Sequence, residues 1–294
     1  MLPHTDPFNR QITIGLGCFL ETLVMAAAEE GVGVELDLFP QGEDATGLDA
    51  RPVAIARFHG EAVPDPLFQH VLARRTQKEP YDLARPVSDQ VLSQLATACV
   101  HGTHAQGSND TQVVAALRAL SAEALTIEIE TPRTLKESVD LFRIGHAEVD
   151  ATPDGIALSG PMIETITALG LFSRAASLDP NSSAYAQGLS AVLNNANTAM
   201  AHVWQVTQGN TRVDQITAGR DWLRLHLAAT QAGVALQPLS QALQEYEEMA
   251  GLYADIHKML APDGGTVQMF ARLGYCDPIA PSPRWPVEEK ILNG

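Results

Sequence analysis

The chain has 294 residues, 45% of them hydrophobic and 18% charged, which is ordinary for a globular protein that buries a full core. Its formal net charge of −16 disfavours nonspecific binding to nucleic acid or to an anionic membrane. Three scattered cysteines without a CxxC pair indicate neither a disulfide framework nor a zinc ribbon. With no signal-peptide pattern and no apolar run of about 20 residues, we expect a cytoplasmic protein without a membrane partner.

The first 60 residues are predicted to form one helix and two strands. Apolar residues recur at helical spacing over residues 17–30, and Gly31 is expected to end that helix. Alternation of apolar and polar residues over 32–38 predicts a strand, and the run 53–58 predicts a second one. A loop rich in glycine and aspartate, residues 40–52, connects them.

The rest of the chain alternates helices with strands, which favours a mixed α and β layered fold. The predicted helices cover residues 65–75, 88–100, 110–121, 131–149, 161–170, 211–232 and 240–260. The predicted strands cover residues 125–130, 202–207 and 266–275. A polar loop is expected over 101–110, a loop also follows the helix 211–232, and the proline-rich tail 277–290 is expected to be extended.

The stretch "IGLGCFL", residues 14–20, suggests a dinucleotide-binding βαβ unit at first sight. It follows a short apolar run, and Asp37 stands twenty residues after Gly17 at the end of the next predicted strand. The third glycine of the GxGxxG motif is Leu20, however, so the match is partial and weak.

An internal similarity gives these glycines another interpretation. A shift of 202 positions pairs residues 10–34 with residues 212–236 and yields eight identities, among them Arg10 with Arg212 and Gly17 with Gly219. Neither the first glycine nor the aspartate recurs in the second copy. We therefore expect two related helices that pack closely through their glycines, with Asp37 facing solvent. The alternative is a chance match between alanine-rich helices.

The segment "LARRTQKEPYD" concentrates cations in an acidic chain. Arg74, Arg75, Thr76 and Lys78 offer two guanidinium groups, a hydroxyl and an ammonium, which suits a phosphate clamp. If the segment is extended, Arg74, Thr76 and Lys78 lie on one side. The alternative is a solvated helix end whose cations offset the helix dipole.

Two further segments are candidates for ligand binding. In "GVALQPLSQ" a proline interrupts an apolar stretch, and Pro238, Leu239, Ser240 and Gln241 form a loop that can present backbone N–H groups to a ring edge or an anion. The alternative is a plain loop with Ser240 as a helix N-cap. In the tail, Arg284 can close an anion site, or it is simply solvated.

The sequence indicates no metal site and no catalytic side chain. His101 and His104, near Cys99, have a spacing that a metal can use, but their polar loop offers no carboxylate except Asp110 and no second motif. No GxSxG, Walker A, HExxH or kinase motif is present.

Taken in order, these segments resemble the nitroreductase-like flavoprotein superfamily. The resemblance is carried by residues 74–78, by residues 233–241, by "RLGY" at 272–275 and by Pro283-Arg284. More narrowly, "DPFNRQITIGLG", "RRTQKEPYD", "GRDWLRLHLAATQAGV" and "PLSQALQEY" resemble the Acg-like branch, in which two such halves are fused in one chain, often behind a twin-arginine signal.

The resemblance implies an α+β fold, a three-layer α/β/α sandwich built from two related halves. Residues 1–60 would be the remnant of the first half and residues 61–294 the second half. A flavin-facing N-x-Q-P-W segment of the family would precede "DPFNRQ", where only five residues stand. A pseudo-dimeric monomer or a homodimer is expected, and a periplasmic location if an upstream signal exists.

For function, the resemblance implies an FMN-dependent oxidoreductase that passes hydride from NAD(P)H to an electron-poor acceptor, such as a quinone or a nitro compound. Arg74, Thr76 and Lys78, beside Arg75, would hold the phosphate and ribityl end of FMN, and Arg284 would close on the phosphate. The backbone of residues 238–241 would face the flavin N5 edge. Gln77, Lys78, Gln237 and Gln241 depart from the commoner family residues. The alternative is a catalytically silent protein that binds or sequesters flavin, or a non-enzymatic interaction protein.

Overall fold

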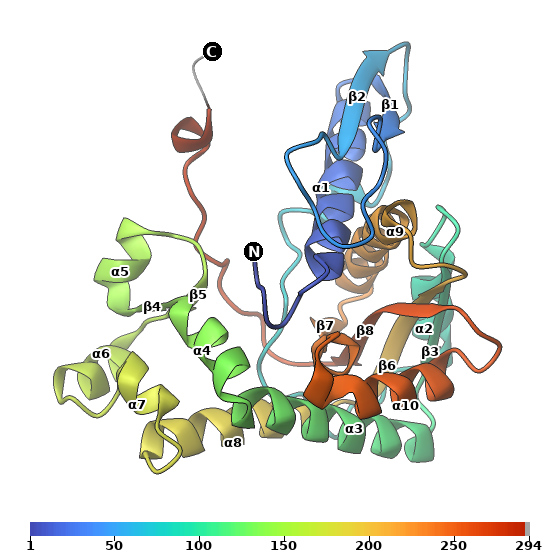
Figure 1. The fold of residues 1–294 in the computed structure, drawn as a ribbon. Coiled ribbons are helices and arrows are strands. Elements are labelled where there is room, and N and C mark those ends of the chain that lie inside the picture. The colour runs from blue at the N-terminus through green and yellow to red at the C-terminus, as the bar shows by residue number, and fades with distance from the viewer. Residues whose placement is uncertain (292–294) are drawn as a thin grey trace. The chain divides into compact units, whose positions relative to one another are not determined.

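The computed structural model describes residues 1–291, which form two compact units (Figure 1). The first unit comprises Met1–Ala124 and Asn195–Asp277, and the second comprises Leu125–Asn194 with the tail that begins at Pro278. Two helices, α3 (Thr111–Glu130) and α8 (Ser183–Asn197), contribute residues to both units.

The first unit is built on a four-stranded antiparallel sheet and a separate two-stranded hairpin. The sheet has the order β3-β6-β8-β7, and the hairpin pairs β1 with β2. The elements of this unit are α1 (Arg10–Glu29), β1 (Gly33–Leu38), β2 (Ala54–His59), η1 (Phe68–His70), α2 (Asp89–Thr97), β3 (His104–Ser108), β6 (Ala201–Thr207), α9 (Arg212–Gln231), β7 (Ala235–Pro238), η2 (Gln241–Leu243), η3 (Glu247–Met249), α10 (Ala250–Leu260) and β8 (Thr266–Gly274).

Strand β6 is buried along its whole length because helices cover both of its faces. Successive side chains of a strand point to opposite faces. Val203 packs into the core that α9 forms with β8, whereas the Trp204 indole on the other face donates a hydrogen bond of 3.1 Å to the Leu260 carbonyl of α10. The predicted strands 202–207 and 266–275 and the helix 211–232 are thus correct.

The second unit is mainly helical and holds one short parallel pair of strands, β4 with β5. Its elements besides α3 and α8 are α4 (Pro132–Asp140), β4 (Phe142–Ile144), α5 (Gly145–Ala151), β5 (Ile156–Leu158), α6 (Pro161–Ala168), α7 (Arg174–Leu178) and η4 (Val287–Lys290). In the tail, the Trp285 indole donates to Asp154 at 3.1 Å and the Lys290 ammonium lies 4.1 Å from the Trp285 ring centre.

Several predicted elements are wrong, and each error has a local cause. The alternating run 125–130 continues the helix α3, which ends just before Pro132 instead of giving way to a strand. Positive φ at Gly145 separates β4 from α5 inside the predicted helix 131–149. The loop 101–110 contains β3, because pairing with β6 satisfies its backbone groups.

Other boundaries also differ from the prediction. The helix predicted over 65–75 is only the 3₁₀ turn η1, and the first ten residues of the predicted helix 240–260 are two 3₁₀ turns. β7 occupies a stretch that was expected to be loop, and α7 and α8 were not predicted. The helix that periodicity predicts over 17–30 begins earlier, at Arg10, close to the bounds 9–30 that the internal similarity predicts, and Gly31 follows its end with φ 76°.

The dinucleotide-binding hypothesis for "IGLGCFL" is wrong. A βαβ unit needs a strand before its helix and a parallel strand after it. Residues 1–9 form no strand, and β1 pairs only antiparallel with β2 within the described chain. Asp37 is a half-buried strand residue whose side chain forms an ion pair of 3.1 Å with Arg57 across the hairpin.

Helices α1 and α9 cross backbone against backbone at their glycines. A Cβ added to Gly17 would lie 2.9 Å from the Gly219 Cα and closer still to the Ile216 carbonyl oxygen. A Cβ on Gly219 would lie 2.8 Å from the Gly17 Cα and would collide with the Ile14 carbonyl oxygen. The expected close packing of the two helices through these glycines is confirmed.

Each of the two helices begins with a buried arginine. The Arg10 guanidinium donates to the Leu243 and Gln268 carbonyls and forms an ion pair of 3.1 Å with Glu245. The Arg212 guanidinium donates to the Asp44 and Phe8 carbonyls at 2.8 and 2.6 Å. Full hydrogen bonding is what allows these charges to be buried. Each arginine thereby ties its helix to a loop.

Among the described helices, α1 alone is long and apolar enough to cross a membrane by length and composition. A buried helix of a protein core meets the same criteria, and α1 packs along α9.

The helix crossing gives a direct stability test. Replacing Gly17 by alanine places a methyl group against the α9 backbone, so we expect the free energy of unfolding in urea to fall by about 1–3 kcal/mol. The control is Gly15→Ala, two residues away on the same helix, where an added Cβ meets nothing within 4 Å. That change is expected to be neutral or to stabilise by about 0.5–1 kcal/mol. Equal effects of the two substitutions would contradict the crossing.

Candidate cofactor site

The predicted clamp segment runs as an extended chain beside β7. Thr76 forms a parallel bridge with Leu236, and the Gln77 N–H donates to the Leu236 carbonyl at 3.0 Å. Because alternate residues of an extended segment share a side, Arg74, Thr76 and Lys78 lie together. No α-helix ends at this segment in the described chain, but the 3₁₀ turn η1 precedes it and the Arg74 N–H donates to the His70 carbonyl at 2.9 Å, so the alternative of cations at a helix end stays open.

A histidine of α9 holds the first part of the clamp. The Arg75 carbonyl can only accept a hydrogen bond, so the His226 Nε2, at 3.0 Å, is the protonated nitrogen that donates to it. The Nδ1 atom is then free to accept from the Arg74 Nη1 at 3.4 Å. Burial and, to a smaller extent, the Arg74 charge lower the pKa of His226 to about 3, so the ring is neutral at pH 7. No motif in the sequence indicated this residue.

The other clamp residues differ in exposure. Arg75 points its Nη1 at the Leu72 and Arg74 carbonyls, and its buried Nε has no hydrogen-bond partner among residues 1–291. Thr76 is half-buried, and Lys78 is exposed while its carbonyl accepts from the Asn195 side chain. The segment thus offers an unused buried donor and an exposed ammonium beside Arg74.

The buried Arg272 of β8 fixes the C-terminal end of the clamp segment to the sheet. The Arg272 guanidinium donates to the Glu79 carbonyl at 2.8 Å and to the Gln237 side chain at 2.6 Å. It also lies 3.8 Å from the centre of the Tyr81 ring. Residues 77–81 therefore cannot move independently of β7 and β8.

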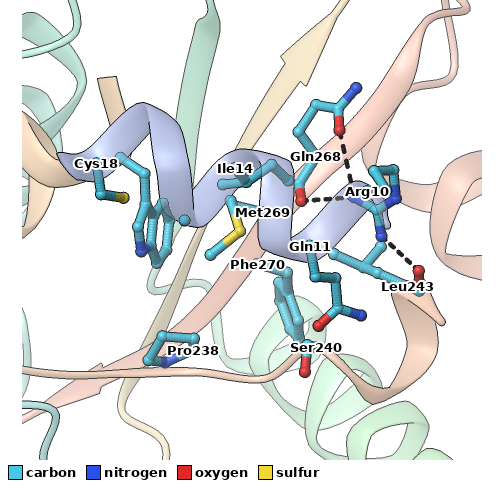
Figure 2. A pocket seen from close by; sticks show the side chains of 12 residues that line it. Arg10, Gln11, Ile14, Cys18, Pro238, Ser240, Leu243, Gln268, Met269 and Phe270 are labelled. Carbon is cyan, nitrogen blue, oxygen red and sulfur yellow. Dashed lines mark hydrogen bonds between the residues drawn. The ribbon is translucent and has the colours of Figure 1, made fainter. Parts of the chain in front are cut away.

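A cavity of about 190 Å³ lies between α1 and the loop that follows β7 (Figure 2). Gln11, Ile14 and Cys18 of α1 lie on one side, and Pro238 and Ser240 lie opposite them, as the close-up shows. The remaining lining residues are Arg10, Gly15, Trp222, Leu243, Gln268, Met269 and Phe270. Most of this lining is apolar or aromatic.

Only two of the four residues in the predicted loop 238–241 line this cavity. Pro238 and Ser240 line it, whereas Leu239 is buried and its N–H donates to the Phe270 carbonyl at 2.9 Å. Because the Leu239 N–H group already donates to the Phe270 carbonyl, it is not available to a ligand in the cavity. Ser240 is the N-cap residue of η2, as the alternative expected, although its side chain makes no capping hydrogen bond among the described residues. Gln241 is the first residue of η2, and its carbonyl accepts from the Gln244 N–H.

The clamp and the cavity adjoin each other through β7 and α9. Thr76 bridges Leu236, which lies two residues before the cavity residue Pro238. Burial raises the pKa of Cys18, another lining residue, to about 11, and the nearby Arg74 charge opposes that shift. Its thiol donates to the Gly219 carbonyl at 3.1 Å, which places it at the helix crossing.

Arg284 belongs to the second unit. It is exposed, and its guanidinium donates to its neighbour's Pro283 carbonyl at 2.8 Å. A closing role on the same anion as Arg74 stays a prediction.

The volume of the cavity is that of one part of a larger ligand. Sites that enclose a whole drug-sized ligand measure roughly 300–1,000 Å³. At about 190 Å³, this one suits a flat apolar ring, while a charged group attached to that ring would lie outside it near the clamp. An apolar ring pocket beside a cationic segment fits the two chemically different ends of FMN.

His101 belongs to the packing of the fold, whereas His104 is exposed and lies beside the Gln106 side chain. The buried Asp221 carboxylate accepts from the backbone N–H groups of Val100, His101 and Thr103 at 2.8–3.1 Å and so fixes this loop. His101 Nε2 lies 2.9 Å from the Glu21 carboxylate. Among the described residues, no group of three histidine, cysteine, aspartate or glutamate side chains is placed to hold a metal.

Glu21 is the centre of a buried charge cluster between α1 and α9. Its carboxylate lies 2.8 Å from Arg220 Nε and 3.0 Å from Arg224 Nη1. Burial by itself raises the pKa of Glu21, but His101 and the two arginines outweigh it and lower the pKa to about 2.

No protein-family model matches the sequence, and no curated protein does. Solved structures do match. The FMN-dependent nitroreductase NfnB from Mycobacterium smegmatis, in complex with NADPH, is 19% identical over 78% of this chain and 98% of its own, with a TM-score of 0.43.

Two further matches have similar values. A nitroreductase with bound FMN from Desulfitobacterium hafniense is 14% identical over 78% of this chain and 99% of its own, with a TM-score of 0.43. A nitroreductase-like family protein from Bacillus cereus is 11% identical over 80% of this chain and 100% of its own, with a TM-score of 0.41.

The Glu21 cluster generates a pH-dependent prediction. Glu21→Gln leaves the partly buried Arg220 without its carboxylate and leaves Arg224 with Asp65 alone, so we expect the unfolding free energy at pH 7 to fall by about 3 kcal/mol. The folded-state pKa is lowered from 4.5, so this stabilisation is complete above pH 4.5 and is lost as the pH falls toward 2.

Urea unfolding of wild type and variant at several pH values measures this difference. The control is Glu29→Gln, an exposed residue at the end of α1, which is expected to change the unfolding free energy by less than about 0.5 kcal/mol. A difference between wild type and Glu21→Gln that stays constant from pH 7 to pH 2.5 would rule out the ionised, paired carboxylate.

Proposed function

We propose that this protein is an FMN-dependent oxidoreductase of the nitroreductase type. It would take hydride from NAD(P)H and pass it to an electron-poor small molecule such as a quinone or a nitro compound. The observation that carries the proposal is the juxtaposition of the extended segment 74–78 with the cavity that Pro238 and Ser240 line, joined through β7. The resemblance of both segments to flavoprotein motifs arose from the sequence independently of this geometry.

The chain's own residues would bind and orient the cofactor. Arg74, Thr76 and Lys78 would hold the phosphate, since a guanidinium, a hydroxyl and an ammonium on one side of the segment suit its oxygens. Arg75 alternates to the other side of the segment, and its buried Nε, without a hydrogen-bond partner among residues 1–291, would reach the phosphate only if its side chain turned. Ile14, Trp222 and Phe270 would exclude water from the ring, which lowers the local dielectric. When bound, the flavin itself supplies the redox chemistry.

We also propose that the chain derives from two related halves, with residues 1–60 as the remnant of the first and residues 61–294 as the second. α1 and α9 have the same length, and both their bounds and the starts of the following strands, β1 and β7, differ by 202 positions. Glu43 and Glu245 differ by the same number; Glu43 accepts from the backbone N–H of Arg212, and Glu245 accepts from the side chain of Arg10. This reciprocity supports the duplication more strongly than identities in alanine-rich helices.

Flavin binding by the purified protein tests the function. We expect FMN fluorescence to be quenched on binding and Arg74→Ala to weaken FMN binding by about tenfold or more, because it removes a charged donor to the phosphate. The matched control is Arg57→Ala, an exposed arginine of β2 that pairs with Asp37, which is expected to leave the affinity unchanged. A wild-type protein that binds no FMN would refute the proposal.

Turnover distinguishes the enzyme from a silent flavin-binding protein. An active enzyme oxidises NADPH or NADH faster when a quinone or a nitroarene is added to the FMN-loaded protein. Binding of FMN without such acceleration would favour the alternative of a flavin-binding or sequestering protein.

A further inference from the structure

The clamp depends on a residue that is not part of its motif. His226 lies on α9 and is 4% exposed, yet both of its ring nitrogens contact the clamp segment. The other buried histidine within residues 1–291, His202, has no hydrogen-bond partner for either nitrogen. Burial alone therefore does not account for the contacts of His226.

The contacts of His226 fix two consecutive residues of the segment at once. Nε2–H donates to the Arg75 carbonyl, which sets the backbone, and Nδ1 accepts from Arg74, which sets the guanidinium. A charged imidazolium has no acceptor nitrogen, so only the neutral ring can make both contacts. The burial that lowers the pKa of His226 to about 3 keeps it in this form.

The position of His226 on α9 also links the clamp to the cavity. Trp222, which lines the cavity, lies four residues earlier and thus one turn away on the same helix face. One rigid helix therefore supplies a wall of the cavity and the support of the clamp.

We propose that His226 is a positioning residue for flavin binding: it holds Arg74 in the orientation that selects a phosphorylated flavin over an unphosphorylated one. The inference rests on the proposed function. It attributes the preference for FMN over riboflavin to the His226 imidazole, which acts through Arg74. The binding of the flavin ring is attributed to the cavity.

The test compares dissociation constants for FMN and riboflavin in the full-length protein. His226→Phe keeps the ring shape but removes both contacts, so we expect FMN binding to weaken about tenfold while riboflavin binding changes less than about twofold. His226→Gln, whose amide can donate to Arg75 and accept from Arg74, is expected to restore most of the preference. His202→Phe is the control for the loss of a buried imidazole and should leave the preference unchanged.

The possible results separate the inference from the proposed function. If wild type prefers FMN and folded His226→Phe keeps that preference, or loses affinity for both flavins equally, His226 has no positioning role. If the wild-type protein binds neither flavin, the proposed function and this inference are both refuted.

A measurement on the wild-type protein covers the case in which His226→Phe does not fold. Nitrogen NMR at pH 7 should show His226 as the neutral ring protonated at Nε2, and its Nδ1 resonance should shift on addition of FMN but not of riboflavin. A protonated ring, the other tautomer, or identical responses to both flavins would overturn the inference.

Discussion

The direct backbone contact of α1 with α9 at Gly17 and Gly219 is the constraint on which the rest of the first unit depends. Side chains of any size at these positions would push the helices apart, because the neighbouring atoms are the Ile14 and Ile216 carbonyls. The close approach brings the α1 residues Ile14 and Cys18 over the loop that follows β7, and so encloses the cavity. It also buries Glu21 against two arginines of α9.

The acidic chain places its buried cations where they hold segments in position. Arg10 and Arg212 tie the first turns of the two helices to loops, and Arg272 ties residues 77–79 to β7. These three guanidinium groups bond mainly to carbonyls and amides of the fold, so they are structural. Arg74 differs, since it is half-buried and its Nη1 lies 3.4 Å from the neutral ring of His226. That difference separates a candidate ligand-binding cation from the structural ones.

Sequence patterns predicted those parts of this architecture that depend on neighbours along the chain. Helix α9, the strands β6 and β8, and the glycine contact follow from periodicity and from the internal similarity. β3 was not predicted, because its polar, glycine-containing sequence becomes a strand only through pairing with β6. Within the site, the motif residues were visible, but His226 and Ile14 were not, because only the tertiary fold brings their helices to the clamp and to the loop.

A crystal structure of the protein grown with FMN tests the central claim, that the cavity and the extended segment together form a flavin site. The account predicts density for the flavin ring in the cavity between Ile14 and Pro238, with the phosphate within hydrogen-bonding distance of Arg74 and Thr76. A flavin bound elsewhere on the chain, or crystals grown at saturating FMN that show only side chains and water in this cavity, would contradict it.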